Sequence, residues 1–144
     1  MVVVSIIASS LLGAMIFFST IIAPTVFTVL EPSQASRFLR TLFPRMFLLG
    51  IFVGLAIMVA GLILADIFSL AVGFLIFFGF FINKTSIMPK INILSDAISN
   101  GDDEKRKEFG RMHALSVGLF LVCGLVCLVG ISLPWIDQLK IYWL

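Results

Sequence analysis

Residues 109–116, Phe109-Gly110-Arg111-Met112-His113-Ala114-Leu115-Ser116, stand where a charged segment gives way to a long apolar run. The stretch contains the only histidine of the chain, and the apolar run continues to residue 133. An α-helix needs about 20 mostly apolar residues to cross a bilayer. The sequence therefore predicts a transmembrane helix over residues 109–133, with His113 near its start.

The composition extends this expectation to the whole chain. Of 144 residues, 60% are hydrophobic and 12% are charged, whereas a soluble domain carries roughly a quarter charged residues. We expect one all-α domain, residues 1–144, built as an integral membrane bundle of four transmembrane helices. The predicted helices cover about 2–30, 44–65, 67–83 and 109–133, and residues 84–108 form an amphipathic, charged section.

Prolines and polar residues set the expected boundaries of these helices. Proline fits the first turn of a helix but disrupts a helix interior. We therefore expect Pro44 to begin the second helix, Asp66 to mark a tight turn, and Asn83 to leave the membrane. By the same rule, Pro24 should kink or end the first helix, Pro89 should break the helix beyond residue 83, and Pro134 should close the fourth.

Small residues indicate where helices approach closely in lipid. Ser5, Ser9 and Gly13 recur every four residues and share one face of the first helix. Gly50 and Gly54 form a Gly-x-x-x-Gly pattern in the second helix. Both faces are expected to pack against other helices.

Basic residues predict the orientation of the chain. Nine of the ten fall in or beside the two connectors on one side, and only Lys140 falls on the other. The positive-inside rule places both connectors in the cytoplasm and both termini outside the cytoplasmic (inner) membrane. The net charge of +2 is too small to indicate a nucleic-acid partner. The nine residues are Arg37, Arg40, Arg45, Lys84, Lys90, Lys105, Arg106, Lys107 and Arg111.

Chemically capable side chains gather on one side of the fourth predicted helix. His113, Ser116, Phe120, Cys123 and Cys127 fall within about a quarter-turn at 100° per residue, and this face should point into the bundle. His113 is either a hydrogen-bonded structural residue or a ligand, for example an axial ligand of haem. The two cysteines either pack as small apolar groups or bind a soft metal ion such as copper(I).

No nucleophile–base pair and no paired carboxylates within the predicted spans suggest catalysis, so we do not expect an enzyme. The alternatives are a protein that handles a small molecule or metal, or an accessory subunit of a larger membrane complex. A haem- or metal-binding redox protein is the second hypothesis. The first, non-catalytic hypothesis predicts no cofactor. Besides the lipid bilayer, the expected partners are further copies of the chain or other membrane subunits.

Four short elements punctuate the apolar runs: residues 23–30, Phe43-Pro44-Arg45, Pro89-Lys90-Ile91 and residues 109–116. The pattern resembles the transmembrane-protein-205-like family of small four-helix membrane proteins. The resemblance implies no established reaction, and platinum-drug resistance among eukaryotic relatives implies the handling of soft-metal compounds. With the expected topology, these elements fall at the cytoplasmic helix ends. We expect them to form a cluster in which Arg45 and His113 face a shallow polar cavity, with Pro24, Phe43, Pro44, Pro89, Phe109 and Ser116 around it.

Overall fold

The computed structural model describes the backbone of residues 2–143, and the side chains of these residues apart from 133 and 135–143. Over this range the chain is helical apart from short turns, as predicted. Four helical rods are long and apolar enough to cross a membrane. They cover Val2–Val29, Pro32–Ile63, Ile67–Ser99 and Asp103–Ser132.

Each rod consists of one or more helical elements. The first contains α1 (Val2–Phe17), the π-helical turn η1 (Phe18–Ile22) and α2 (Ala23–Val29); the second is α3 (Pro32–Ile63). The third contains α4 (Ile67–Ile82), a second π-helical turn η2 (Asn83–Ile87) and α5 (Met88–Ser99). The fourth begins with the 3₁₀ turn η3 (Asp103–Lys105) and continues as α6 (Arg106–Trp143).

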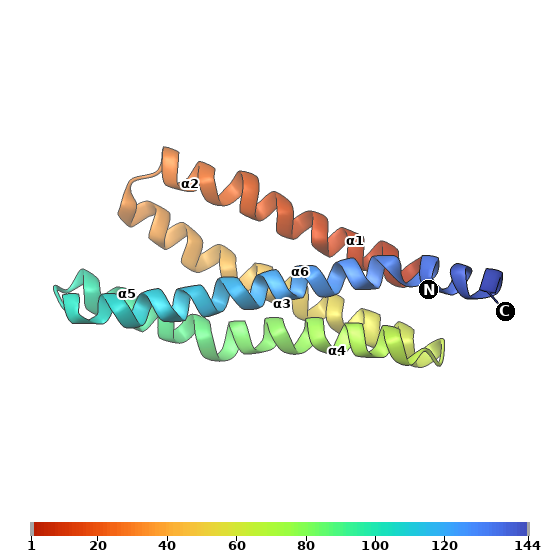
Figure 1. The fold of residues 1–144 in the computed structure, drawn as a ribbon. Helices are drawn as coiled ribbons and strands as arrows, with labels where there is room; N and C mark the ends of the chain where they lie inside the picture. Colours follow the sequence, from red (N-terminus) through yellow and green to blue (C-terminus); the bar gives the residue numbers. More distant parts are fainter. Residues whose placement is uncertain (1, 144) are drawn as a thin grey trace.

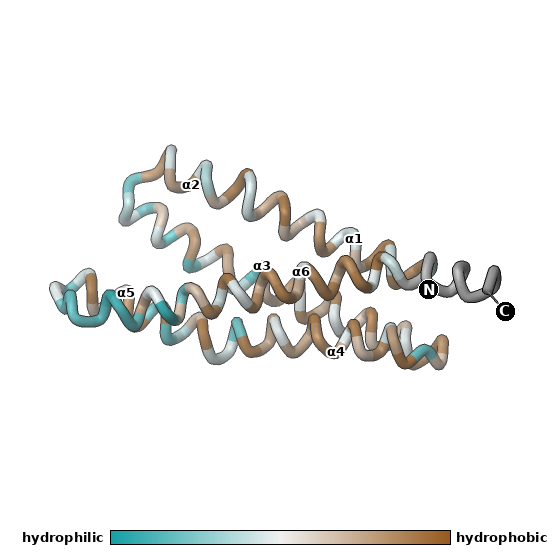
Figure 2. Tube along the Cα trace, viewed as in Figure 1, coloured by the Kyte–Doolittle hydropathy of each residue, from teal (hydrophilic) through white to brown (hydrophobic). Residues whose placement is uncertain are grey.

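The rods form an up-and-down ring in chain order (Figure 1). α3 packs against α1 and α4, and α6 closes the ring because it also packs against α1 and α4. The main core lies between the four rods and includes Leu11, Phe47, Ile76 and Cys127. Figure 2 shows hydrophilic residues gathered where α5 meets the start of α6 and where α2 meets α3, which are at the same end of the bundle.

Glycines hold α3 and α4 together, as the Gly-x-x-x-Gly pattern predicts. A Cβ added at Gly54 would lie 2.5 Å from the backbone nitrogen of Phe77, and one at Gly61 would lie 2.6 Å from that of Leu70. Only glycine allows this approach, so the pattern serves packing within the chain. The expected face of α1 is different: Ser5 is half-buried, but Ser9 and Gly13 are exposed, and α1 packs through larger side chains such as Leu11 and Met15.

Pro24 and Pro89 do not end their helices, which corrects the sequence expectation. Each lies two residues after a π-helical turn, η1 before Pro24 and η2 before Pro89. A proline ring clashes with the carbonyl four residues earlier and supplies no N–H. The wider π turn accommodates this defect, so both rods continue through the proline. Asn83, predicted to leave the membrane, is instead the first residue of η2 and is buried.

Two further boundaries also differ from prediction. α3 begins at Pro32, where Glu31 and Gln34 form a capping box, and Pro44 lies inside the helix. The helix therefore begins twelve residues before Pro44, because the capping box satisfies its first N–H groups. α6 likewise continues past Pro134 to Trp143.

The polar section 84–108 is not a separate helix lying flat on a surface. α5 extends the rod of α4, packs against α6 and buries Met88 and Leu94. Arg40 of α3 reaches Asp96 of α5 in an ion pair of 2.6 Å. The predicted apolar side of this segment exists, but neighbouring helices cover it.

The turn at Asp66 connects α3 to α4 as predicted. Ala65 adopts a left-handed conformation with φ of 49°, and Asp66 caps α4 by accepting hydrogen bonds from the backbone N–H groups of Phe68 and Ser69. The Ser69 hydroxyl also donates to the Asp66 carboxylate. Burial acts to raise the pKa of Asp66, but the hydrogen bonds from Ser69 and Phe68 outweigh it and hold the pKa below its usual value.

Candidate functional site

A buried polar pair joins the third and fourth rods. The Ser116 hydroxyl donates to Asn83 Oδ1 at 2.6 Å, and Asn83 Nδ2 donates to the Ser116 carbonyl at 3.0 Å. Asn83 is 1% exposed and Ser116 is 9% exposed. Every buried side-chain N or O atom in the described part of the chain has a hydrogen-bond partner. The pair therefore fixes the register between η2 and α6.

A chain of aromatic rings crosses the bundle beside this pair. Phe18 of η1 contacts Phe43 of α3 at 5.0 Å between ring centroids, and Phe43 contacts Phe47 at 5.8 Å. Phe47 then contacts Phe80 of α4 at 6.1 Å, and Phe80 contacts Phe120 of α6 edge-on at 6.0 Å. Phe18, Phe47 and Phe80 are buried, while Phe43 and Phe120 are half-buried. The four rods thus share one aromatic layer.

The interface between α1 and α6 is closed at the end near the chain termini. The Ser5 hydroxyl lies 3.1 Å from the Gly130 carbonyl and 3.3 Å from the Ile131 carbonyl, both of which can accept its hydrogen bond. Further along, a Cβ at Gly124 would lie 3.5 Å from Met15 Cε. From residue 124 to residue 131, therefore, α1 covers α6.

The same interface is open at the other end. Phe18 packs on Phe43, and α2 packs on α3, but η1 and α2 make at most marginal contact with the described part of α6. Figure 1 shows α2 diverging from the start of α6. Ser19, just beyond Met15, is exposed. The first rod leaves α6 near the π-helical turn.

One line of residues along the surface of α6 runs from the closed end of its interface with α1 to the open end. At 100° per residue, Arg106, His113, Val117, Gly124 and Ile131 fall within about 40° of one another. Gly124 is buried and Ile131 is half-buried under α1, whereas the other three are exposed. We use the term open seam for the region between the exposed part of this line and the part of the first rod that diverges from it. The exposed part of the line consists of Arg106, His113 and Val117.

His113 is exposed in the structure, whereas the sequence predicted an interior position. The helical wheel correctly places Ser116, Cys123 and Cys127 inside the bundle, but His113 is exposed and stacks on Phe109 at 6.0 Å with nearly parallel rings. Further along α6, residues on the same line as His113 are covered by α1, but α1 has diverged at the level of His113. The imidazole is therefore accessible from the seam.

The two cysteines are free and buried. A Cβ at Gly79 would lie 2.5 Å from Cys123 Sγ, so this glycine makes the room that the thiol occupies. Cys127 is 0% exposed in the main core. Among the described residues, no three His, Cys, Asp or Glu side chains are grouped as metal ligands. Both thiols thus lie in the interior of the bundle.

The other residues of the predicted cluster are dispersed at this end of the bundle. Phe43 and Pro44 are half-buried, while Pro24 and Pro89 are exposed. Arg45 is also exposed, and two residues of helix place it about 160° around α3 from the buried Phe47. Arg45 thus points away from the core.

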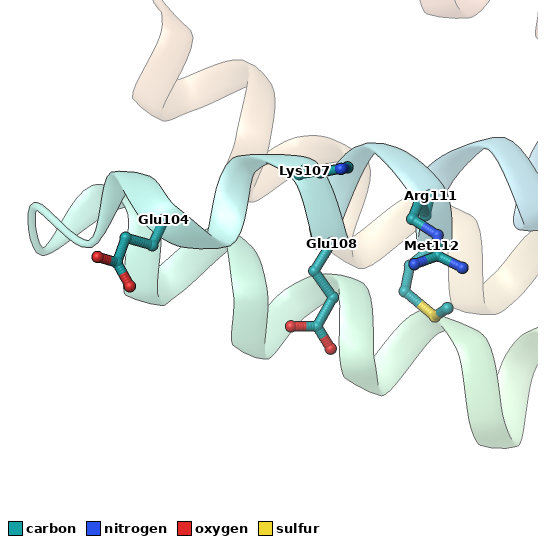
Figure 3. A pocket seen from close by; sticks show the side chains of 5 residues that line it. All are labelled: Glu104, Lys107, Glu108, Arg111 and Met112. Atoms are coloured by element: carbon teal, nitrogen blue, oxygen red, sulfur yellow. The ribbon is translucent and has the colours of Figure 1, made fainter.

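Two surface pockets at this end contain neither Arg45 nor His113. One is a depression along the start of α6, where Figure 3 shows Lys107 directed away from the carboxylates of Glu104 and Glu108. Arg111 and Met112 complete it. The other lies on the first turns of α3 and includes Arg37 and Phe38. Both are shallow surface features.

Sequence reasoning missed Asn83 as an interior residue. Its partner lies 33 positions away, so no local pattern joins them. The available signal is its place directly after the apolar run of α4, where a buried polar group needs a hydrogen-bond partner from another helix.

Together the four rods and their apolar surfaces define a multi-pass α-helical membrane protein. The chain belongs to the family described as Domain of unknown function (DUF4149), whose model matches residues 6–99. This match ends with α5, so the α6 part of the seam lies beyond it. No curated protein and no solved structure is significantly similar to the chain.

Proposed function

We propose that the protein is a non-catalytic component of the cytoplasmic membrane that binds a small amphipathic molecule in the open seam. The observation that carries this proposal is the contrast along a single line of α6. α1 covers Gly124 and Ile131 but leaves His113 and Val117 exposed. An apolar surface next to an accessible polar group suits a ligand that has both characters.

The aromatic layer supports a ligand site at this level. Phe43 and Phe120 are half-buried, and the ring contacts from Phe43 through Phe47 and Phe80 to Phe120 form a continuous series. Aromatic and aliphatic side chains with a few polar groups are typical linings of small-molecule sites. The tail of a ligand in the seam would lie against this layer.

The unequal distribution of basic residues between the two ends of the bundle supports an orientation in which the open end faces the cytoplasm. Nine of the ten basic residues lie in helical segments nearer the open end than the chain termini, and basic residues at helix ends favour the cytoplasmic side. In this orientation both termini are on the extracytoplasmic side of the membrane, and the seam opens toward the cytoplasmic leaflet. The Phe43-Pro44-Arg45 and 109–116 motifs also support kinship with the transmembrane-protein-205-like family, which we retain as part of the proposal.

Ligand retention in matched variants tests the proposal. Val117 lies in the seam, whereas Val122 is exposed on the opposite side of α6, about 140° away. Native mass spectrometry of protein released from lipid nanodiscs should detect a small molecule bound to the wild type and to Val122→Trp. Val117→Trp should lose most of it, because the indole fills the seam. Equal retention by both variants would refute the proposal.

A haem- or metal-binding redox role is the alternative, favoured by the accessibility of the His113 imidazole in the seam. The same preparation tests it through a visible spectrum and a metal analysis. A haem band that disappears in His113→Ala would favour the redox role over the amphipathic ligand.

A further inference from the structure

Only one of the two walls of the open seam carries charged or titratable side chains. Residues 2–29, which form the whole first rod, contain no Asp, Glu, Lys, Arg or His. The opposite wall, α6, contributes Arg106 and His113. Of these two walls, therefore, only α6 can offer a charged group to a ligand.

Of the two nearby carboxylates, that of Glu108 lies away from the seam line, whereas that of Asp103 contacts Arg106. Glu108 is five residues before His113, which places it about 140° around the helix, and it pairs with Lys105 at 3.9 Å. Asp103 accepts a hydrogen bond from Arg106 Nε at 2.8 Å. Since a guanidinium has five N–H donors, this bond leaves both terminal NH₂ groups of Arg106 available to an acceptor.

Polarity changes along the seam. Arg106 and His113 lie at the polar end, and Val117 follows about 16 Å from Arg106 along the axis. Next comes the half-buried ring of Phe120, at the edge of the aromatic layer. A ligand that fits this order has a negatively charged head and an apolar tail.

We propose that the occupant of the seam is an anionic phospholipid from the leaflet at the polar end, with its phosphate near Arg106 and His113 and an acyl chain along Val117. This inference rests on the proposed function, since it assigns a chemical class to the same site. Complementarity selects the head group, because Arg106 is a permanent cation whose terminal NH₂ groups can donate to a phosphate, His113 adds an imidazole N–H donor, and the first rod offers no charge of either sign. The length and order of the apolar part select a lipid over a free anion.

Competition between two lipids with identical acyl chains tests the head group. Detergent-solubilised protein is incubated with equal amounts of phosphatidylglycerol and phosphatidylcholine, and bound lipid is counted by native mass spectrometry. One cation near an anionic lipid surface is worth about fivefold in binding, so the wild type should prefer phosphatidylglycerol by about that factor or more. Arg106→Gln/His113→Gln should bind both lipids almost equally.

Lys107→Gln/Arg111→Gln is the matched control, because it alters two basic residues of the same helix that lie away from the seam. It should retain the preference. Loss of the preference in this control, or its survival in Arg106→Gln/His113→Gln, would overturn the assignment of the head group.

Two further results separate this inference from the proposed function. If Val117→Trp abolishes binding while the wild type binds both lipids equally, the seam is a site but the anionic class is wrong. If Val117→Trp leaves all binding unchanged, the seam itself fails as a site. A photo-reactive amino acid at Val117 should capture lipid in membranes, and capture of a polypeptide would contradict a lipid occupant.

Discussion

Asn83 and Ser116 satisfy each other's hydrogen bonds in the interior of the bundle, at 2.6 Å from hydroxyl to Oδ1 and 3.0 Å from Nδ2 to carbonyl. Asn83 is also the first residue of the π-helical turn that precedes Pro89. The pair thus fixes α6 to the third rod next to that rod's most irregular turn.

This pair should contribute measurably to stability. We expect a double-mutant cycle of Asn83→Leu and Ser116→Ala to give a coupling free energy of about 1 kcal/mol, because neither group finds a replacement partner in an apolar interior. Unfolding in mixed micelles by a denaturing detergent measures it. Ser10→Ala, at an exposed position of α1, is the control and should change little. Additive single effects would show that the pair is not coupled.

The glycine interface predicts opposite results at two glycines. A Cβ at Gly54 would meet the Phe77 backbone at 2.5 Å, whereas one at Gly118 would meet nothing within 4 Å. Gly54→Ala should therefore destabilise the protein by about 1–3 kcal/mol. Gly118→Ala should be neutral or slightly stabilising, since alanine favours the helix. Equal effects on the unfolding free energy would disprove the close packing of α3 on α4.

The Asp66 cap predicts an acid-sensitive turn. Because its pKa is lowered in the folded state, Asp66 stabilises the fold above the unfolded-state pKa, and this stabilisation is lost as the pH falls through the folded value. Asp66→Asn should reduce stability at neutral pH by about 1 kcal/mol or less, the lower part of the range for a cap. The difference from wild type should shrink on acidification below about pH 4. A difference independent of pH would mean that the carboxylate charge is irrelevant.

The proposed orientation predicts the result of reporter fusions. Alkaline phosphatase fused to the C-terminus should be active, because it is active only outside the cytoplasm. Green fluorescent protein inserted at Gly101, which lies in the turn between α5 and η3, should fluoresce. The reverse pattern at the two sites would invert the topology and put the seam in the outer leaflet.

Sequence reasoning predicted those features that depend on local pattern. The apolar runs gave the four rods, the glycine spacing gave the α3–α4 contact, and Asp66 gave the turn. The wheel of α6 placed Ser116, Cys123 and Cys127 inside the bundle. These results follow because a helical face and a length are both read from neighbours in sequence.

The features that it missed depend on tertiary structure. Pro89 was expected to break a helix and Pro24 to kink or end one, but both rods continue because a π-helical turn precedes each proline. Asn83 needed a partner that belongs to another rod. His113 was expected to point into the bundle, but it is exposed because α1 diverges from α6 before this level. No pattern within α6 contains that information.

The divergence of the first rod from α6 underlies both proposals, and distances between spin labels test it directly. Labels at Ser9 and Leu128 report on the closed end, and labels at Thr25 and Val117 report on the open end; all four positions are exposed. The measurement uses a background in which Cys123 and Cys127 are alanine, with the protein in lipid nanodiscs. We predict a clearly longer mean distance for Thr25–Val117 than for Ser9–Leu128. Equal distances, or a shorter one for Thr25–Val117, would show that α2 lies against α6 and that there is no open seam.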